Sequence, residues 1–466
     1  MNAYIYMDNY RGFSDAVVPL QQVNFLVGEN STGKSSFLDL LEIISEFQFW
    51  MLQPSFHSIG KKGRHFFDLV SASSQNRAEF TVGAVSVGPD KEELRGMFVT
   101  YVNDEWRPVP RRVSVLSEDG IRTIDGRIAG LSSDGRYRYR RIELNVMLHD
   151  IASADGVREF AELHRRGDGF LDGVVDENKS RYPTFMRYAD ELFSDGAMKG
   201  GFVSVPEPFG RTYYELAPIR SKPRRTYDAP QTATNPEGDH TPYLIRKRLD
   251  DPKVSEQFKK FLNEFGHSSG LFESLSIKGF GADSVAPFEM QVELGETSLS
   301  LQNVGYGVSQ ALPVLVETFV REKETAFCIQ QPEVHLHPRA QAAFGDVIAE
   351  LARSENKLFF VETHSDFMID RFRLNVRQNR NVGLASVRSE NNVVSRKIVD
   401  DYGVVRNSDE IGNQDDKPSF GQILFFERVD GQNVAHQIPI MKNGDLSADQ
   451  PEGYREFFIN ESLSLL

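Results

Sequence analysis

Several features are scarce in this sequence of 466 residues, and each scarcity excludes a class of protein or a kind of bond. A single cysteine, Cys328, excludes a disulfide within the chain and suits a reducing cytoplasm. No apolar run approaches the roughly 20 residues of a membrane span, and the N-terminus has no signal-peptide pattern. Acidic residues outnumber basic ones, and the net charge of −14 argues against a protein that coats nucleic acid. It does not exclude a local basic groove. We therefore expect a cytoplasmic, globular chain of two or three lobes.

One motif indicates a definite chemistry. Residues 28–35 read Gly-Glu-Asn-Ser-Thr-Gly-Lys-Ser, the pattern of a loop that binds nucleotide phosphates. An apolar run at 23–27 and a helical apolar pattern to about Met51 predict a strand before the loop and a helix after it. Lys34 would reach the β- and γ-phosphates of ATP, and Ser35 would bind Mg²⁺. The expected nucleotide contacts are Gly28, Glu29, Asn30, Ser31, Thr32, Gly33, Lys34, Ser35 and Ser36. The alternative is a glycine-rich turn that binds nothing.

Two later stretches have the form of a second half of such a site. Residues 303–310 make a small-residue loop ahead of an apolar helix at 312–320, which suits a second anion or else is a plain helix start. The apolar strand 326–330 ends in Gln330 and Gln331, with Glu333 close behind. Ligands that reach Mg²⁺ through water, and a general base, belong at such a strand end.

Histidines follow these stretches. The apolar strand 358–362 leads to His364, which we expect to contact the γ-phosphate, a satisfied core histidine being the alternative. His335 and His337 are spaced by two, but no cysteine or third histidine stands nearby. We therefore do not expect a zinc site.

The order of elements predicts an α/β fold. A mixed sheet would carry the phosphate loop beside an antiparallel β-layer, and a mostly helical insert would interrupt the domain. The predicted segments are 1–144 with the phosphate loop, 145–270 with the insert and a basic loop, 271–400 with the second half of the site, and 401–466 as a C-terminal extension. Residues 208–245 read as irregular, 407–419 as a loop and 454–466 as a terminal helix.

Two basic stretches allow two interpretations each. Residues 136–140 alternate arginine and tyrosine and indicate either a nucleic-acid contact or, preferably, an exposed antiparallel strand with one basic face. The stretch 215–225, with two prolines, either places Arg220, Arg224 or Arg225 against a phosphate or an acidic partner, or is a solvated loop.

The set of motifs resembles the ABC-type ATPase heads of SMC and DNA-repair proteins, and more closely the OLD-like ATPases of bacterial anti-phage systems. Residues 304–310 match the signature motif of that family. The resemblance implies that Gly305, Gly307 and Ser309 contact ATP held by a second subunit of a homo-oligomer. Residues 331–338 resemble its Walker B region, and His364 matches its switch histidine. Residues 217–223 and 451–454 resemble two further family segments, and residues 100–210 are mostly uncovered.

One departure bears on turnover. Glutamines stand at 330 and 331, where that family has acids, and glutamine neither accepts a proton as a general base nor neutralises Mg²⁺. Either Glu333 takes over, or hydrolysis is slow, or the glutamine was introduced to trap ATP. We predict slow hydrolysis, with Glu333, Gln331 and His364 as the catalytic candidates and Ser35 and Gln330 on the Mg²⁺ side.

The resemblance also suggests a role. The chain lacks the heptad run of an SMC coiled coil, and the residues after His364 show no nuclease pattern. The layout looks like the sensor ATPases of two-gene defence systems, the AriA type of PARIS first and the PtuA type of Septu second. Those imply a separate Toprim or HNH nuclease effector and a phage-encoded trigger. The alternative is a DNA-bound repair ATPase of the RecF kind.

Overall fold

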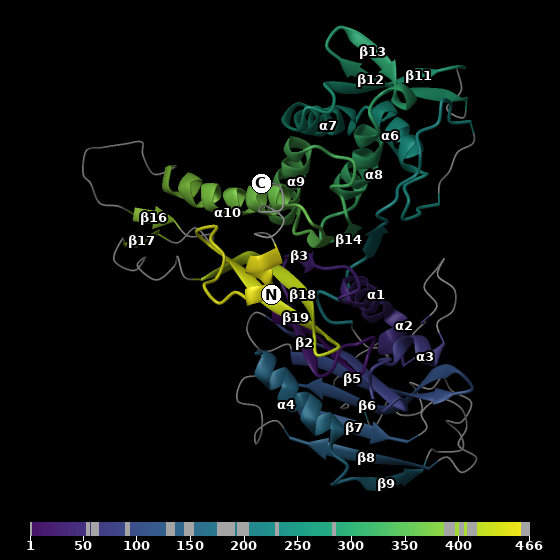
Figure 1. The fold of residues 1–466 in the computed structure, drawn as a ribbon, viewed down its shortest axis with the longest axis vertical. Coiled ribbons are helices and arrows are strands. Elements are labelled where there is room, and N and C mark those ends of the chain that lie inside the picture. Colours follow the sequence, from purple (N-terminus) through teal and green to yellow (C-terminus); the bar gives the residue numbers. More distant parts are fainter. Residues whose placement is uncertain are drawn as a thin grey trace. The chain divides into compact units, whose positions relative to one another are not determined.

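A computed structural model provides the structure of the chain, and its residues form two compact units (Figure 1). The structure describes residues 2–52, 56, 65–88, 94–126, 136–143, 153–174, 192, 205–228, 233–281, 286–385, 397–399, 405–407 and 417–457. The first unit comprises Met1–Gln21, Gly28–Thr212 and Phe425–Gln437. The second comprises Gln22–Val27, Tyr213–Leu424 and Ile438–Leu466. No helix among the described residues is long and apolar enough to cross a membrane.

The first unit is built on an eight-stranded sheet in the order β2-β1-β4-β5-β6-β7-β8-β9, antiparallel throughout. This confirms the predicted antiparallel layer. Its strands are β1 (Asn2–Asp8), β2 (Ala16–Leu20), β4 (Glu79–Val87), β5 (Leu94–Asp104), β6 (Arg107–Ser117), β7 (Gly120–Asp125), β8 (Arg136–Ile142) and β9 (Leu171–Val174). Its helices are α1 (Lys34–Ser45), α2 (Phe47–Trp50), α3 (Phe66–Leu69) and α4 (Ala154–Arg165).

Helix α4 packs on this sheet (Figure 1). Ser153 caps its start by accepting a hydrogen bond from the Gly156 N–H at 3.1 Å. Val157, Phe160 and Ala161 recur at helical spacing and are buried against Phe98 and other core residues of the strands. One hydrophobic core of the first unit therefore lies between α4 and a face of the sheet.

The second unit contains a six-stranded sheet in the order β10-β14-β15-β3-β18-β19. Strands β10, β14, β15 and β3 are parallel to one another. The strands are β3 (Val23–Gly28), β10 (Tyr213–Leu216), β14 (Ala326–Gln330), β15 (Leu358–Glu362), β18 (Pro418–Val429) and β19 (Gln432–Met441). The last residue of β3 and parts of β18 and β19 belong to the first unit. Smaller antiparallel sheets are formed by β11 (Ser274–Gly279), β12 (Phe288–Leu294) and β13 (Thr297–Ser300), and by β16 (Lys397–Val399) and β17 (Val405–Asn407).

Longer helices accompany these sheets among the described residues, and Figure 1 shows β11 to β13 at the end of the unit beyond α6 and α7. They are α6 (Thr241–Asp250), α7 (Ser255–Ser269), α8 (Tyr306–Val320), α9 (Pro338–Glu355) and α10 (Asp366–Ala385), with the 3₁₀ turn η3 (Leu301–Asn303) before α8. A side chain at Gly345 of α9 would lie 2.5 Å from the Met368 carbonyl oxygen of α10. The lack of a side chain there lets the two helices approach closely. Together with the sheets, these helices confirm the predicted α/β fold.

Two predicted elements differ from the structure. The helix predicted from Lys34 to about Met51 is interrupted at Glu46, whose backbone is extended, and the Trp50 indole N–H donates to the Ile44 carbonyl at 2.7 Å. The prediction of irregular chain over 208–245 is wrong at Tyr213–Leu216, which is edge strand β10 of the parallel sheet. Stacking of Tyr213 on Phe360 and of Tyr214 on Phe327 fixes that strand. Four residues are too short for a periodic signal.

Other predictions are tested only in part. The chain changes from the first unit to the second between Thr212 and Tyr213, inside the predicted insert 145–270. Our segment boundaries therefore stay predictions. Residues 452–457 are helical, while 458–466 of the predicted terminal helix, and 408–416 of the predicted loop, lie outside the described residues.

Candidate functional site

The phosphate loop of the first unit has the backbone that its glycines predict. Gly28 has a φ of +142°, and a Cβ on it would lie 2.0 Å from the Phe426 carbonyl oxygen. Gly33, with a φ of +100°, directly precedes α1, and a Cβ there would lie 2.6 Å from the Phe13 ring. Both positions therefore require glycine.

Lys34 closes this loop. Its side chain is buried, and Nζ donates to the carbonyl oxygens of Gly28 and Glu29, each at 2.7 Å. The Thr32 hydroxyl also donates to the Glu29 carbonyl, at 2.8 Å. No side chain caps the start of α1, and the first N–H groups of a helix have no partner within it. An ammonium and a helix start on one loop, with the Ser35 side chain exposed beside them, fit a polyphosphate and Mg²⁺.

In the second unit, the predicted strand 326–330 is β14, and it ends at Gln330. Gln330, the last residue of β14, is in register with Glu362, the last residue of β15. Glu362 is in turn in register with Leu26 of β3, so the three strands end at one edge of the sheet. The Gln331 N–H donates to the Glu362 carbonyl at 2.8 Å, and Gln331 has a φ of +45°. That left-handed backbone is uncommon outside glycine and is consistent with a functional turn.

Glu333 and His364 are brought together, but through the backbone of the histidine. Glu333 Oε1 accepts from the His364 N–H at 2.7 Å. The His364 side chain is exposed, with its ring centroid 6.1 Å from that of Phe457. Glu333 Oε2 is buried and has no hydrogen-bond partner among the described residues. Burial raises the pKa of the Glu333 carboxyl. The His364 N–H, the Thr363 hydroxyl and the charge of Arg220 lower that pKa, but by less than burial raises it. A carboxylate oxygen held without a partner suits an incoming water or a hydrated ion.

Arg220 belongs to the same strand end, which the sequence did not reveal. Its side chain is 1% exposed, and Nη2 donates to the Gln330 carbonyl at 2.9 Å. Its backbone is fixed by Gln310, whose Oε1 accepts from the Arg220 N–H at 3.3 Å. Nε and Nη1 have no hydrogen-bond partner among the described residues. Burial lowers the pKa of Arg220 to about 10, a shift that the Glu333 carboxylate opposes. The solvated-loop interpretation is therefore wrong for Arg220.

Glu215 is the second residue that sequence reasoning missed. It lies on β10, and its Oε1 accepts from Gln330 Nε2 at 3.0 Å. The available signal was the position of Glu215 and Arg220 around the end of a strand, where ligand-binding residues of parallel sheets gather. That signal was hidden because β10 itself was not predicted.

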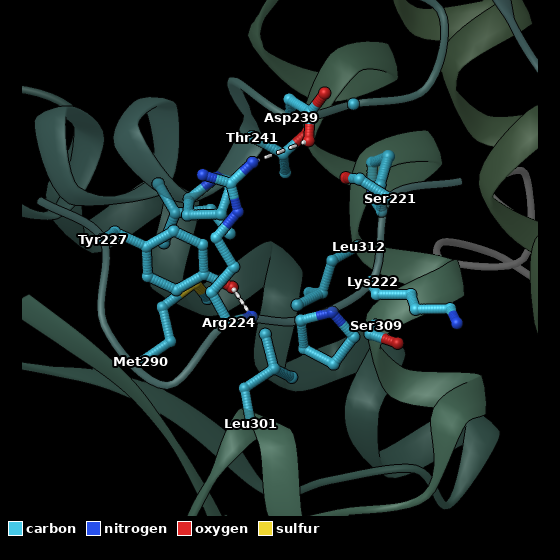
Figure 2. A pocket seen from close by; sticks show the side chains of 15 residues that line it. Ser221, Lys222, Arg224, Tyr227, Asp239, Thr241, Met290, Leu301, Ser309 and Leu312 are labelled. Carbon is cyan, nitrogen blue, oxygen red and sulfur yellow. Dashed lines mark hydrogen bonds and ion pairs between the residues drawn. The ribbon is translucent and has the colours of Figure 1, made fainter. Parts of the chain in front are cut away.

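Ser309 of the predicted signature loop and residues 221–224 of the basic loop line one small pocket of the second unit (Figure 2). Helix α8 begins after Gly305, without a side-chain cap, and the Ser309 hydroxyl donates to the Tyr306 carbonyl at 2.8 Å. In Figure 2, Ser309 and Lys222 lie on one side of the pocket, and Arg224 reaches toward Asp239 at 3.6 Å. A Cβ on Gly305 would meet nothing within 4 Å, which leaves open space at the start of the helix.

The remaining candidates have structural contacts. His337 caps α9, its Nδ1 accepting from the Ala340 N–H at 3.4 Å, and the His335 ring meets Tyr306 edge-on. The described residues contain no group of three His, Cys, Asp or Glu placed to hold a metal ion.

Strand β8 is the predicted basic strand, and the side chains of two of its arginines form contacts within the first unit. Arg138 forms an ion pair with Asp125, to which Arg112 also donates, at 2.9 Å. Arg140 is buried and donates to the carbonyls of Leu163 and Asp168. The guanidinium groups of Arg112, Arg138 and Arg140 surround the Phe170 ring at 5.7, 5.1 and 4.7 Å from its centroid. Arg138 and Arg140 therefore hold this end of the sheet together.

Comparisons with known proteins add the family. A model described as "AAA domain, putative AbiEii toxin, Type IV TA system" matches residues 23–370. An OLD nuclease of Thermus scotoductus (strain ATCC 700910 / SA-01) is 30% identical over 189 residues, which are 38% of this chain and 34% of that protein. This chain therefore covers about a third of the length of that relative.

Solved SMC heads align over most of the chain, at low similarity. The SmcHead bound to the C-winged helix domain of ScpA gives a TM-score of 0.41 at 10% identity, covering 94% of this chain and 97% of that one. The SMC head domain from Thermotoga maritima gives 0.36 at 12% identity, covering 94% and 98%. Similarities of this size carry no functional conclusion. The family match, in contrast, runs from β3 through the phosphate loop, α8 and the ends of β14 and β15. The chain therefore belongs to the AAA-type ATPase family with the description "AAA domain, putative AbiEii toxin, Type IV TA system".

Proposed function

We propose that the chain binds ATP with Mg²⁺ at the phosphate loop and turns it over slowly. The observation that carries the proposal is the closure of the loop by Lys34, whose Nζ donates to the Gly28 and Glu29 carbonyls. A γ-phosphate would replace those carbonyls as the partner of the ammonium. The start of α1 would supply N–H groups, and Ser35 would ligate the ion. Bound Mg²⁺ would neutralise part of the phosphate charge.

Slow turnover follows from the residues around the β14 strand end. Gln330 and Gln331 are amides, which accept no proton. Glu333 is the acid of this turn, and its Oε2 has no hydrogen-bond partner among the described residues. We assign Glu333 the role of orienting and deprotonating water, and Gln331 that of holding it. The main-chain N–H of His364 holds the Glu333 carboxylate, and the exposed imidazole ring of His364 would contact the γ-phosphate.

We further propose that ATP joins at least two copies of the chain. Gly305, Gly307 and Ser309 would contact the nucleotide of another copy. The open space at Gly305 and the uncapped start of α8 support this role, because a helix start attracts phosphate. The joined copies would act as the sensor and scaffold of a defence complex, which holds a separate Toprim or HNH nuclease until a phage-encoded trigger arrives. Support comes from the relative named OLD nuclease and from the toxin–antitoxin wording of the family.

The test is purification together with the product of the neighbouring gene, with and without MgATP. We expect a nuclease to co-purify and the particle mass to rise at least twofold with MgATP. Lys34→Ala should lose about 10- to 100-fold in ATP affinity, because a charged hydrogen bond contributes about 1.5–3 kcal/mol. Lys260→Ala, on the exposed side of α7, is the matched control. A chain that stays monomeric with bound ATP and retains no nuclease would refute the sensor role.

A DNA-repair ATPase is the second candidate, and the engaged arginines of β8 count against it. Binding of duplex DNA at several salt concentrations separates the two functions. Tight binding that collapses between about 50 and 200 mM salt would favour repair, since released counterions dominate such binding.

A further inference from the structure

The inference concerns a polar cavity on the sheet of the first unit. Asp8, Thr81, Thr100 and Arg112 stand in register on the four neighbouring strands β1, β4, β5 and β6. Residues in register on adjacent strands present their side chains on the same face of a sheet. All four line a cavity of about 320 Å³, and Arg165 at the end of α4 lines it as well. This volume lies within the usual range of small-molecule sites.

The floor of this cavity is fixed by a chain of hydrogen bonds. The hydroxyl oxygens of Thr81 and Thr100 lie 2.8 Å apart, and Thr100 Oγ1 lies 2.8 Å from His164 Nε2. His164 Nδ1 lies 2.7 Å from Ser114 Oγ, and all of these side chains are buried. The two threonines therefore have partners within the fold, and a ligand has to be recognised by the charged and amide groups around them.

A β-bulge brings two successive arginines to one end of the cavity. Thr100 of β5 pairs with Arg112, and the next residue of β5 pairs with Pro110. Arg111 is therefore an extra residue on β6. Successive side chains of a regular strand point to opposite faces, but a bulge re-aims one of them, and Arg111 and Arg112 both line the cavity. The Nε atom of Arg112 is buried and has no hydrogen-bond partner among the described residues.

Hydrogen-bond acceptors gather at the other end of the cavity, at β1 and β4. Asp8 and Glu79 line it there with carboxylates, and Asn9 lines it directly after Asp8. Asn9 Nδ2 donates to the carbonyl oxygens of Asn76 and Glu79, at 2.5 and 2.6 Å. Asn9 Oδ1 is buried and has no hydrogen-bond partner among the described residues. An unused acceptor thus accompanies the carboxylates, and an unused donor accompanies the arginines.

The charges of the two ends are only loosely paired within the chain. Arg111 Nη1 lies 3.4 Å from Glu79 Oε2, and these side chains are 48% and 40% exposed. Arg165 Nη1 lies 3.4 Å from Asp8 Oδ2. Exposed pairs of this kind contribute little to stability, so the charged groups of a ligand can take their place. A ligand of one sign would be repelled at one end of the cavity, whereas a ligand with both signs is attracted at both ends.

We propose that this cavity binds a short peptide of two or three residues, held by its two charged ends. The amino-terminal ammonium would lie against Asp8, Glu79 and Asn9 Oδ1. The carboxylate would lie against Arg111 and Arg112. The row from β1 to β6 spans three strand spacings, or roughly 14 Å between backbones, and the side chains shorten this gap. Two or three extended residues, at about 3.3–3.6 Å each, fit the remainder, and a single amino acid does not.

The experiment is a ligand-observed NMR titration of the full chain with triglycine, N-acetyl-triglycine and triglycine amide. We expect triglycine to bind with a Kd below about 1 mM, and each blocked form to bind at least about tenfold more weakly, because it lacks one charged hydrogen-bonding end. Arg111→Gln should weaken triglycine about tenfold and leave triglycine amide unchanged. Asp8→Asn should weaken triglycine and leave N-acetyl-triglycine unchanged. Arg95→Gln, at an exposed arginine of β5 outside the cavity, is the matched control.

Three results would overturn the proposal. Equal binding of triglycine and N-acetyl-triglycine would mean that the cavity accepts an anion alone. Binding that survives Arg111→Gln would place the peptide elsewhere on the chain. A folded chain with a Kd for triglycine above about 1 mM would have no such site. Where Asp8→Asn melts early, Arg111→Gln decides, because the Arg111 side chain is nearly half exposed.

Discussion

Glu333 shows how one residue can be costly for folding and useful for a reaction. It is held by one main-chain hydrogen bond from His364, while its other oxygen is buried without a partner among the described residues. A buried, unpaired carboxylate oxygen destabilises a fold. Arg220, whose Nε and Nη1 have no hydrogen-bond partner among the described residues, has the complementary charge. Such unmet hydrogen-bonding capacity is typical of sites that receive a ligand.

Glu333→Gln should stabilise the folded chain above mildly acidic pH. Burial raises the pKa of Glu333 above the ordinary glutamate value of about 4.3, so folding favours the neutral form. Its contribution to stability is present below that ordinary value and is lost as the pH rises through the raised pKa. The gain of the variant over the original chain should therefore grow from pH 5 to pH 8. We therefore expect the variant to be the more stable of the two chains at pH 8.

Unfolding in urea across that pH range measures this difference, and Glu289→Gln, a change at a partly buried glutamate of β12, is the matched control. If the curves of Glu333→Gln and the original chain run parallel, the carboxylate is not strained by burial. The same variant should lose the residual hydrolysis. Robust turnover that Lys34→Ala abolishes but Glu333→Gln leaves intact would remove Glu333 from the mechanism.

At the scale of elements, the two loops that precede α1 and α8 depend on glycine for different reasons. Gly28 needs both its positive φ and the missing side chain, because the Phe426 carbonyl occupies the place of a Cβ. Gly305 has an ordinary negative φ and no atom within 4 Å of a Cβ position. The first glycine is therefore required for folding, and the second is free to serve binding.

Gly28→Ala should lower the free energy of unfolding by about 3 kcal/mol or more, since backbone strain at such a site costs about 1–3 kcal/mol before the clash is added. Gly305→Ala should stay within about 0.5 kcal/mol of the original chain. Thermal melts compare the two variants. By our proposal, Gly305→Ala should still weaken the MgATP-dependent association of two copies, measured by light scattering. A stable Gly28→Ala variant would contradict the tight approach of Phe426.

At the scale of the whole molecule, two compact units share three strands of the six-stranded sheet, since β3, β18 and β19 have residues in both. The chain crosses from one unit to the other several times. Multi-domain chains often unfold in more than one step, so a single melting temperature describes them poorly. The change in melting temperature that a ligand causes is therefore more informative than the melting temperature itself.

MgATP should raise the melting temperature by mass action. At a nucleotide concentration of 100 times Kd, the stabilisation is about 2.7 kcal/mol, which corresponds to a few degrees for a chain of this size. Differential scanning fluorimetry checks this. Lys34→Ala should reduce the stabilisation to about 0.4–1.4 kcal/mol at the same nucleotide concentration, and Lys260→Ala should keep the full shift. An equal shift in Lys34→Ala would mean that the nucleotide binds away from the phosphate loop.

The sequence by itself determined the parts of this protein that are local. The phosphate loop, α8, β14 and β15 were predictable because glycine requirements and apolar periodicity act within a few residues of one another. The family motifs lie on these same elements. Cys328, alone in the chain, needed no structure to exclude a disulfide.

Only the tertiary structure decided the surroundings of the β14 strand end. Strand β10 is stabilised by the stacking of Tyr213 and Tyr214 on residues more than a hundred positions away, so no local sequence pattern predicts it. Arg220 is buried, and Glu215 meets Gln330, because β10 pairs with β14. A hydrogen bond between residues so distant in sequence depends on strand order, and strand order is set by the packing of the whole sheet.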